Sequence, residues 1–318
     1  MRVAVIGAGK RYRTEASIAH AVRSLGHSCR LVDVLGWTNR LGRLALPFLQ
    51  RYAQAFEPDV VILTRAAYRL GEDNLRALVR GRRSVFWYFD IRDTPREETL
   101  TLARLADVMY TTYLREVAVF RAAGIADVRF LPQGMDPALD RPASRIPAEY
   151  RCDVSFIGSA GGPDRHAILR SIAQVADLQI RGPGWEQARG ELPVRGGPLW
   201  GPRFAQAVGG AKVSLGANSV AEQAAQRASA SNRMWKVLGC GGFFLGRYVE
   251  GIEHFARDGV HCAWYRDTAD AVAKVREYLA DPERRQRIAA AGRAHALAHH
   301  TYAHRLELLL AGRGYELA

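Results

Sequence analysis

Apolar positions follow two different periods along this chain. Short runs that are apolar at nearly every position alternate with longer stretches in which apolar residues recur every three or four positions, as Ile18, Val22 and Leu25 do. The first pattern predicts buried parallel strands, and the second predicts amphipathic helices. In the first half the predicted strands are 2–7, 29–34, 59–64, 84–90, 107–112 and 128–132. In the second half they are 152–159, 177–182, 212–218, 241–246 and 260–265.

This alternation predicts an α/β protein with two doubly wound, Rossmann-like domains, 1–140 and 150–300. Between them, the segment 132–150 has four prolines and no periodicity, which indicates an interdomain linker. The chain from Asp281 onward is almost entirely helical in pattern. Because ligands bind at the carboxyl ends of parallel strands, we expect the two domains to face a central cleft.

The charge is strongly positive but spread out. The formal net charge is +13, and 41 of the 45 cationic residues are arginine. Residues 1–150 hold 23 basic and 16 acidic residues, and residues 151–318 hold 22 and 16, so neither end is a basic tail. The excess favours an acidic partner, which could be a nucleotide, a nucleic acid or an anionic membrane surface. A nucleotide bias of the source genome would explain the arginines equally well.

Neither membrane insertion nor export is predicted. No apolar run approaches the roughly 20 residues that a membrane-spanning helix needs. The first ten residues, MRVAVIGAGK, read as a strand and a glycine turn and lack the layout of a signal peptide. The four cysteines (Cys29, Cys152, Cys240 and Cys262) match no metal or disulfide spacing. We therefore expect a cytoplasmic protein with reduced thiols and no integral membrane segment.

The first glycine turn offers one reading of function. In 7-GAGKRYR-13 a G-x-G follows the first strand, and Asp33 ends the second, as in nicotinamide-binding domains. Tyr12 occupies the place of the third glycine, so an NAD(P)-dependent oxidoreductase is an alternative only. A tight turn at the top of a sheet is the simpler explanation.

The second domain begins with a more informative turn, FIGSAGGPDRHAILRSI (156–172). Gly158, Gly161 and Gly162 allow close backbone turns, and Pro163 suits the first turn of a helix. Arg165 would then lie beside the N-terminus of that helix, where anions bind.

A second helix start, SNRMWKVLGCGGFFLG (231–246), completes this candidate site. Ser231 is a favourable N-cap for a helix over 232–238, and Gly239 to Gly242 end it. The planar fork of Arg233 fits two phosphate oxygens. Two glycine-marked helix starts with an arginine each predict a pyrophosphate site, although Arg233 could instead pair with a surface carboxylate.

At these residues the sequence resembles the CgeB-like glycosyltransferases, which have the GT-B fold. The likeness covers about 110–310 well and 1–105 only by fold. It is carried by DVSFIGSAGGPDRHAILRSI, LQIRGPGW, AKVSLGAN, SNRMWKVLGCGGFFL, EGIEHFARDG and the tail from Tyr265 to Arg305. In the first half only YTTYLREVAVFRAAGIADVRFLPQGMDP contributes.

The resemblance implies a hexosyltransferase that uses a nucleotide-sugar such as a UDP- or GDP-sugar and no further cofactor. The C-terminal domain would bind the donor, the N-terminal domain would be on the acceptor side, and the terminal helix in 301–318 would cross back to it. Arg233 and the Gly158–Ser159 turn would hold the diphosphate, and Gly241–Gly242 would let the donor approach. Asn218 would join this site, and Trp185 would lie near the nucleobase unless it is a buried anchor of its loop.

One position departs from the family. Lys236 stands where the family usually has a glutamate that hydrogen-bonds the ribose hydroxyls. A lysine can donate to these oxygens but cannot accept from them. Either Lys236 faces a phosphate, or Glu250 or Glu253 contacts the ribose, or the donor differs from the usual one.

For the chemistry we expect metal-independent transfer, because amides and arginines can stabilise the leaving diphosphate and the sequence lacks a D-x-D motif. Asp90 and Asp93 follow the fourth strand and are the candidates for the base that takes the acceptor proton. Either one could instead cap the next helix or pair with Arg92. The acceptor (a saccharide, a protein, a lipid-linked compound or a nucleic acid) and the stereochemical outcome are not predicted.

Two alternatives stay open at this point. A nucleic-acid-binding or nucleic-acid-modifying protein would use the positive charge. The histidine pairs of the tail, His295 with His299 and His300 with His304, have the spacing of zinc ligands on a helix, but an exposed helix face explains them more simply.

Overall fold

A computed structural model describes residues 1–90, 94–217 and 228–317. The chain forms two compact units, Met1–Gln133 with Tyr302–Ala318, and Gly134–Thr301. The boundary falls near the start of the predicted linker 132–150, most of which packs within the second unit. There Met135 and Tyr150 are buried, and the Met135 N–H donates to the His300 carbonyl (2.9 Å).

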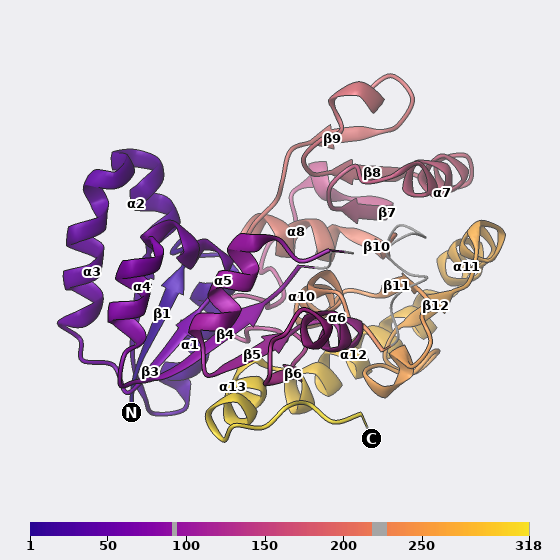
Figure 1. The fold of residues 1–318 in the computed structure, drawn as a ribbon. Coiled ribbons are helices and arrows are strands. Elements are labelled where there is room, and N and C mark those ends of the chain that lie inside the picture. Colours follow the sequence, from indigo (N-terminus) through magenta and orange to yellow (C-terminus); the bar gives the residue numbers. More distant parts are fainter. Residues whose placement is uncertain (91–93, 218–227, 318) are drawn as a thin grey trace. The chain divides into compact units, whose positions relative to one another are not determined.

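The first unit contains one parallel sheet of six strands (Figure 1). The strands are β1 (Arg2–Gly7), β2 (Ser28–Asp33), β3 (Val60–Leu63), β4 (Arg83–Tyr88), β5 (Val108–Thr111) and β6 (Val128–Phe130). Their order in the sheet is β2-β1-β3-β4-β5-β6. The chain thus starts near one edge and doubles back past β1, which is the doubly wound arrangement that the apolar runs predict.

Helices cover both faces of this sheet. They are α1 (Thr14–Ser24), α2 (Val34–Leu41), α3 (Leu46–Gln54), α4 (Glu72–Val79), α5 (Glu97–Leu105), α6 (Leu114–Ala122) and α13 (Tyr302–Leu310). Ile18 of α1 and Leu306 of α13 pack on one face, against Val5 and Trp87. On the other face, Leu49 of α3 and Leu75 of α4 pack in a second cluster with Ile6.

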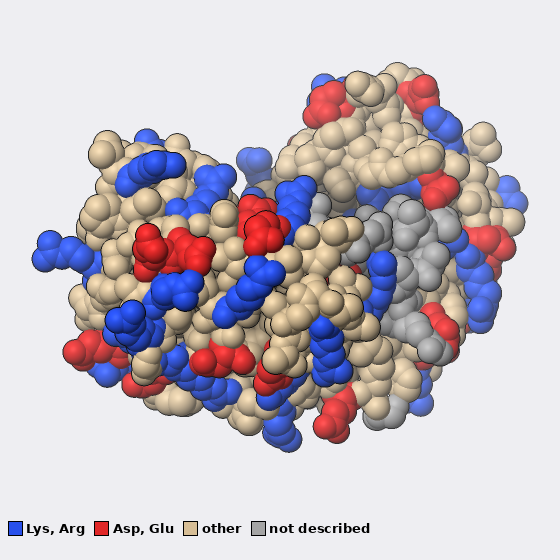
Figure 2. Space-filling view, viewed as in Figure 1, with Lys and Arg blue, Asp and Glu red and all other residues tan. Residues whose placement is uncertain are grey.

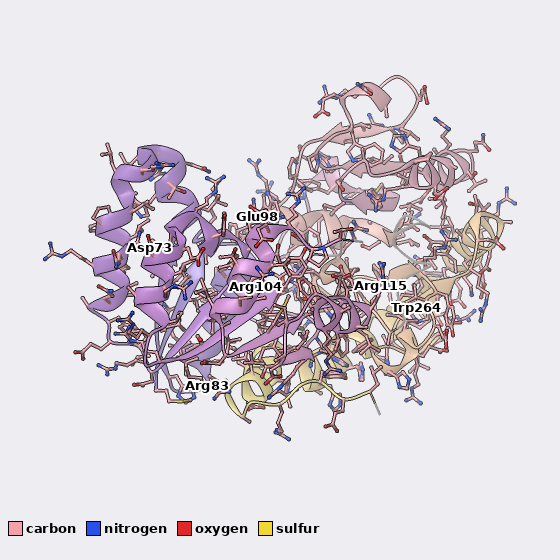
Figure 3. All side chains as sticks on the ribbon, viewed as in Figure 1. Asp73, Arg83, Glu98, Arg104, Arg115 and Trp264 are labelled. Carbon is pink, nitrogen blue, oxygen red and sulfur yellow. The ribbon has the colours of Figure 1, made fainter. Side chains whose placement is uncertain are left out.

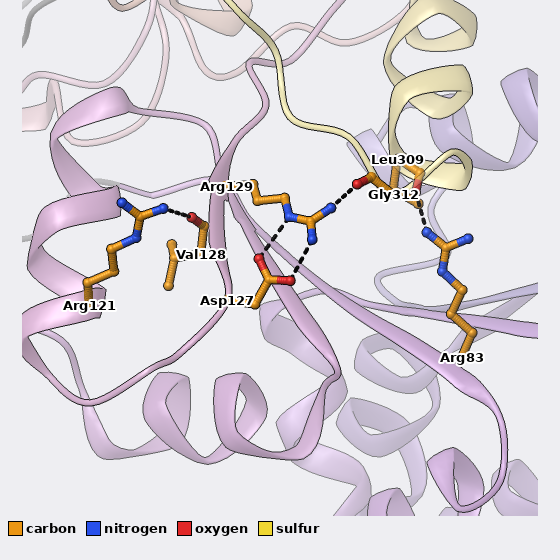
Figure 4. Close-up of polar contacts among 7 residues, drawn as sticks. All are labelled: Arg83, Arg121, Asp127, Val128, Arg129, Leu309 and Gly312. Atoms are coloured by element: carbon orange, nitrogen blue, oxygen red, sulfur yellow. Dashed lines mark hydrogen bonds and ion pairs between the residues drawn. The ribbon is translucent and has the colours of Figure 1, made fainter.

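The C-terminal segment is fastened to the first unit by arginines of its strands (Figure 4). The Arg83 guanidinium donates to the carbonyl oxygens of Leu310 (2.6 Å) and Leu309 (2.8 Å). Arg129 donates to the Gly312 carbonyl, and its fork also binds both carboxylate oxygens of Asp127. Leu309 and Leu310 end α13, where carbonyls lack the N–H donors that a longer helix would supply, and Arg83 donates to both.

The second unit repeats the architecture with different connections. Its strands are β7 (Cys152–Ile157), β8 (Leu178–Arg181), β9 (Val194–Gly196), β10 (Ala211–Gly216), β11 (Phe244–Arg247) and β12 (Ala263–Tyr265). Their order is β12-β11-β10-β7-β8-β9, and the pairs are parallel. The main helices are α7 (Pro163–Ala173), α8 (Pro202–Gly210), α10 (Asn232–Gly239), α11 (Thr268–Ala280) and α12 (Pro282–His299).

Two features differ from the sequence pattern. The edge strand β9 lies in a segment rich in glycine and proline, where no strand is predicted, and it is only three residues long. The helical tail is interrupted at His300 and Thr301, so that α12 belongs to the second unit and α13 to the first. Both residues are buried, and Thr301 bridges to Met135.

Candidate functional site

The glycine turn after β7 is tightly held at the carboxyl edge of the second sheet. The Gly158 N–H donates to the Arg181 carbonyl (2.9 Å), and the Ala160 N–H donates to the Pro183 carbonyl (3.1 Å). The Gly158 carbonyl accepts the indole N–H of Trp185 (2.8 Å). These bonds fix the turn and leave the N–H of Ser159, between the two, without an acceptor among the described residues.

Arg233 meets this turn from helix α10. A Cβ on residue 158 would overlap Nη2 of Arg233, so only glycine leaves room for this guanidinium. The guanidinium carbon also lies 4.7 Å from the centre of the Phe156 ring, at cation–π distance. The structure therefore brings together Gly158 and Arg233, which the sequence places 75 residues apart.

The N-terminus of α10 adds its own positive end. Ser231 is the N-cap, and its hydroxyl accepts the N–H of Met234 (3.3 Å). The first amides of a helix have no acceptor within it and carry a partial positive charge. Arg233 occupies the first turn and is half-buried, so the helix end and the guanidinium are next to each other.

A third arginine, Arg247, belongs to the same edge and is not singled out by the sequence analysis. It is the last residue of β11, which is parallel to β10. Burial raises the pKa of Tyr265, and the charges of Arg247, Arg233 and Arg165 oppose this rise, so all three lie within electrostatic reach of its hydroxyl. A basic residue directly after a predicted strand was the signal that could have identified Arg247.

Arg165 has a different role from the one expected. Its side chain is buried, and its guanidinium donates to the carbonyls of Ala217 (2.6 Å) and Ser159 (3.0 Å). It approaches the same Phe156 ring from 5.8 Å. Arg165 therefore braces the glycine turn from within, and Arg233 is the more accessible of the two cations.

Trp185 is part of the core. It is 1% exposed, stacks on His166 with ring centres 5.0 Å apart, and meets the Phe156 ring edge to face. With its indole N–H on Gly158, it anchors the loop after β8 beneath the turn. This position corresponds to the anchoring alternative and leaves the indole buried instead of presenting a face to a base.

Gly241 and Gly242 do not share a site with Gly158. They precede β11, whereas Gly158 follows β7, and both strands are parallel to β10. The two glycines therefore lie at the opposite edge of the sheet. A Cβ on residue 242 would overlap the Val208 side chain of α8, so this glycine permits close packing of a helix and the sheet. The expectation that these glycines let a donor approach is corrected accordingly.

Lys236 is engaged in an ion pair on the side of α10 that faces the segment 134–141. Its Nζ lies 3.2 Å from Oδ1 of Asp140, whose side chain is 6% exposed. Burial raises the pKa of Asp140, and the positive charge of Lys236 counteracts that rise. Of the three explanations for the lysine, a contact with phosphate therefore receives no support from the structure.

The remaining donor-site predictions are less defined. Asn218 lies outside the described residues. The Glu253 carboxylate accepts the N–H of Asp258 (3.2 Å). Glu253 also lines a surface recess of about 410 Å³ together with Trp264, a residue that is labelled in Figure 3. The carbonyl of Glu250 accepts the Ala228 N–H (2.6 Å). A role of either glutamate toward ribose stays a prediction.

In the first unit, Asp90 lies two residues after the end of β4, at the carboxyl edge of the sheet. Its carboxylate forms an ion pair with Arg65, which follows β3, at 2.7 Å. Both side chains are nearly half exposed, at 41% and 49%. Asp93 and Arg92 lie outside the described residues. Asp90 is thus accessible at the expected edge, and its cationic neighbour is Arg65.

The N-terminal glycine turn uses its own acidic groups for structure. One carboxylate oxygen of Asp33 accepts the N–H groups of Gly9 (2.7 Å) and Gly36 (2.9 Å), which caps α2. Glu15 accepts from the Ala8 N–H and the Thr64 hydroxyl. The carboxylate that would bind a nicotinamide ribose therefore already has two donors, so this observation favours the simpler explanation of a tight turn.

The histidines of the tail pack against aromatic and imidazole rings of other segments. The rings of His261 and His295 are parallel with centres 3.9 Å apart, and His300 stacks on Trp235. Within the described residues, no group of three or more His, Cys, Asp or Glu side chains is arranged to hold a metal ion.

No described helix is long and apolar enough to cross a membrane.

Two parallel sheets of six strands, each covered by helices, are the arrangement of the GT-B class of α/β proteins. Residues 165–311 match a family described as glycosyl transferase-like. A search of curated proteins finds no match.

Solved structures extend the likeness to nearly the whole chain. HepE of Anabaena in complex with UDP and glucose is 15% identical (TM-score 0.65, 98% of this chain and 100% of that one). Sucrose-phosphate synthase of Thermosynechococcus elongatus is 13% identical (TM-score 0.69, 98% of both chains). An alpha-glucosyltransferase in complex with UDP-glucose and DNA containing an abasic site is 10% identical (TM-score 0.75, 98% of both). At these identities the likeness establishes the fold, and with the family match it supports a GT-B glycosyltransferase.

Proposed function

We propose that this protein is a cytoplasmic, CgeB-like glycosyltransferase that moves a sugar from a nucleoside diphosphate sugar to an acceptor hydroxyl without a metal ion. The contact between Arg233 and the Gly158 turn, at the N-terminus of α10, carries this proposal. The Arg233 guanidinium lies against the turn that holds the Ser159 N–H and belongs to the first turn of a helix, and groups of these kinds bind anions.

The chemistry needs this cluster most when the glycosidic bond breaks. The acceptor oxygen bonds to the anomeric carbon as the bond between that carbon and the β-phosphate oxygen opens. The acceptor proton passes to the base, for which Asp90 is the candidate, and the diphosphate leaves with an additional negative charge. Arg233 stabilises that charge through two N–H bonds, and Arg247 adds to the positive potential. Fixed donors of this kind stabilise a developing charge without reorganisation, which is the task that a metal ion performs elsewhere.

The donor we favour is a UDP-sugar, with a GDP-sugar as the alternative. Structures with the same fold were determined with UDP-glucose or UDP, as in HepE and the alpha-glucosyltransferase. Because Lys236 is held by Asp140, we assign the ribose hydroxyls to Glu250 or Glu253. The acceptor is open, and the DNA in one related structure makes nucleic acid a candidate beside saccharides, proteins and lipid-linked compounds.

The test is slow hydrolysis of nucleotide-sugars, because it requires no acceptor. Protein dialysed against EDTA is incubated with a panel of UDP-, GDP- and ADP-sugars, and the released nucleoside diphosphate is measured. We expect release from one donor in EDTA. Gly158→Ala would push the Arg233 guanidinium out of the site, and we expect it to lower release about tenfold to a hundredfold, as loss of a charged hydrogen bond does. Arg233→Gln should have a similar effect.

Gly162→Ala is the matched control, since a Cβ at residue 162 meets no atom within 4 Å. It should release nucleotide at the wild-type rate. Equal rates in wild type, Gly158→Ala and Arg233→Gln would refute the site. Activity that disappears in EDTA and returns with Mn²⁺ would refute metal independence alone, and the absence of release and of binding with every donor would refute the function.

A further inference from the structure

Helix α3 has two apolar faces, and only one of them is buried. Leu49 and Ala53 are at most 1% exposed and pack on the sheet. The adjacent exposed face carries Phe48 and Tyr52, and Leu44 lies in the short turn before the helix; their side chains are 57%, 42% and 85% exposed. Their spacing of four residues aligns them on one side of the helix and of the short turn that precedes it. A stripe of this kind is unusual on a solvated helix.

Helix α2 extends this stripe. Trp37 and Leu41 are 39% and 48% exposed, and the Trp37 ring lies 5.9 Å from that of Phe48. We call these five residues the α2–α3 patch: Trp37, Leu41, Leu44, Phe48 and Tyr52. The patch holds five of the nine large apolar side chains that are exposed in the described part of the chain, within 16 residues. Such concentration marks an interaction surface.

The segment that carries the patch has charges of one sign only. Arg40, Arg43 and Arg51 are exposed, and no aspartate or glutamate occurs anywhere in 34–56. None of the three arginines forms an ion pair with another described residue. Elsewhere on the first unit several cations are paired with acids, as Arg76 is with Glu72, and Figure 2 shows basic and acidic residues interspersed on the face that it draws.

We propose that the α2–α3 patch docks the protein on a membrane surface that contains anionic phospholipids. Tryptophan and tyrosine prefer the boundary between headgroups and acyl chains, leucine and phenylalanine gain from entering it, and arginine binds the phosphates above it. The two helices would lie on the bilayer and not cross it, in keeping with their lengths of eight and nine residues.

The composition of the patch favours lipid over other polyanions and over a second copy of the chain. Nucleic acid would stack on aromatic rings, but it offers nothing to two protruding leucines. A symmetric dimer through this surface would bring the three arginines of each copy toward those of the other without acidic partners. A bilayer satisfies both features, because apolar chains lie just below a layer of negative charge.

Binding of this type depends on charge and on apolar burial together. Each arginine near an anionic surface contributes about 1 kcal/mol, and this contribution falls as salt shortens the screening length. We therefore expect weak binding to neutral vesicles, strong binding to anionic ones and partial release by salt. The binding should not require a nucleotide-sugar or an acceptor, so its outcome is independent of the proposed activity.

The experiment is flotation of the full-length protein with vesicles of phosphatidylcholine alone or with 40 mol% phosphatidylglycerol. We expect at least tenfold more protein on the anionic vesicles. Leu44→Ser combined with Phe48→Ser should reduce that binding at least tenfold, and Arg40, Arg43 and Arg51 changed together to glutamine should do the same. Vesicles with brominated acyl chains should quench part of the tryptophan fluorescence, and Trp37→Phe should remove that quenching.

Matched controls come from the second unit. Trp200 is 46% exposed, so Trp200→Ser removes an apolar side chain of similar exposure. Arg195, Arg276 and Arg287 are also exposed. Changing these three to glutamine lowers the net charge by three, as the triple change in the patch does. Both controls should bind vesicles like the wild type, and circular dichroism should show that every variant is folded.

Three results would overturn the proposal. One is equal binding to neutral and anionic vesicles, or to neither. Another is vesicle binding that depends on the arginines but not on Leu44 and Phe48. If a single-stranded oligonucleotide also abolished that binding, the patch would be a nucleic-acid site. The third is a dimer in sedimentation that dissociates in the Leu44→Ser, Phe48→Ser variant, which would assign the patch to a second copy.

Discussion

A cationic side chain can contribute to an anion site only if its other contacts leave it pointing toward that site. Arg165 is held by the carbonyls of Ala217 and Ser159, and Lys236 by the carboxylate of Asp140. Arg233 lies on the same helix as Lys236, three residues earlier, and reaches the glycine turn instead. The position of a cation along this helix therefore decides whether its side chain joins the candidate site or pairs within the fold.

At the residue scale, the candidate base can be tested directly. We expect Asp90→Asn to lower donor hydrolysis about a hundredfold, since a general base contributes roughly 10² to 10⁴ to a rate. The affinity for UDP, measured by calorimetry, should stay within about twofold because Asp90 belongs to the first unit and Arg233 to the second.

Arg65→Gln is the control for that prediction, as it removes the ion-pair partner of Asp90 and leaves the carboxylate. It should retain at least a tenth of the hydrolysis rate. Full activity of Asp90→Asn would show that another group accepts the proton.

At the element scale, strands are predicted well because buried parallel strands are apolar throughout. The predicted and observed starts of β1 and β7 coincide, whereas β9 is missed because an edge strand of three residues has no such pattern.

The candidate site, too, could be predicted only where a local sequence pattern marks it. Gly158, Ser231 and Arg233 are found from local turn and cap signals, but the sheet edge of Gly241 and the partner of Lys236 depend on contacts that no local pattern encodes.

Helix α13 illustrates how a distant element completes a core. Leu306 is fully buried among Val5, Trp87 and other residues of the first sheet, although it lies more than 200 residues from them. We expect Leu306→Ala to lower the free energy of unfolding by about 3 kcal/mol, the usual effect of such a cavity. Urea unfolding measures this change. Glu307→Ala, at an exposed neighbouring position, should shift it by less than about 0.5 kcal/mol. Equal midpoints for the two variants would show that α13 contributes little to this core.

On the scale of the whole molecule, stability should depend on pH through the histidine stack. His261 lies against His295, and its Nδ1 accepts the N–H of Arg257 (3.3 Å), which requires the neutral ring. Burial, followed by the charges of His295, Arg257 and His299, lowers the pKa of His261 to about 4. Burial also lowers the pKa of His295, whose Nε2 lies 2.8 Å from the Phe255 carbonyl.

The sign follows from which state takes up protons. Below a pH of about 6.5 the unfolded chain takes up protons on both histidines more readily than the folded chain does, so the free energy of unfolding decreases as the pH falls. For His261 this decrease extends from about pH 6.5 toward pH 4. The slope is at most about 1.4 kcal/mol per pH unit for each ring and smaller where solvent reaches it. Urea unfolding at pH 7.5, 6.5 and 5.5 should show this loss. His261→Asn keeps an acceptor for the Arg257 N–H but does not titrate, so its loss between pH 6.5 and 5.5 should be smaller than that of the wild type. Identical pH profiles for the two proteins would mean that carboxylates elsewhere, and not the stacked rings, make the molecule sensitive to acid.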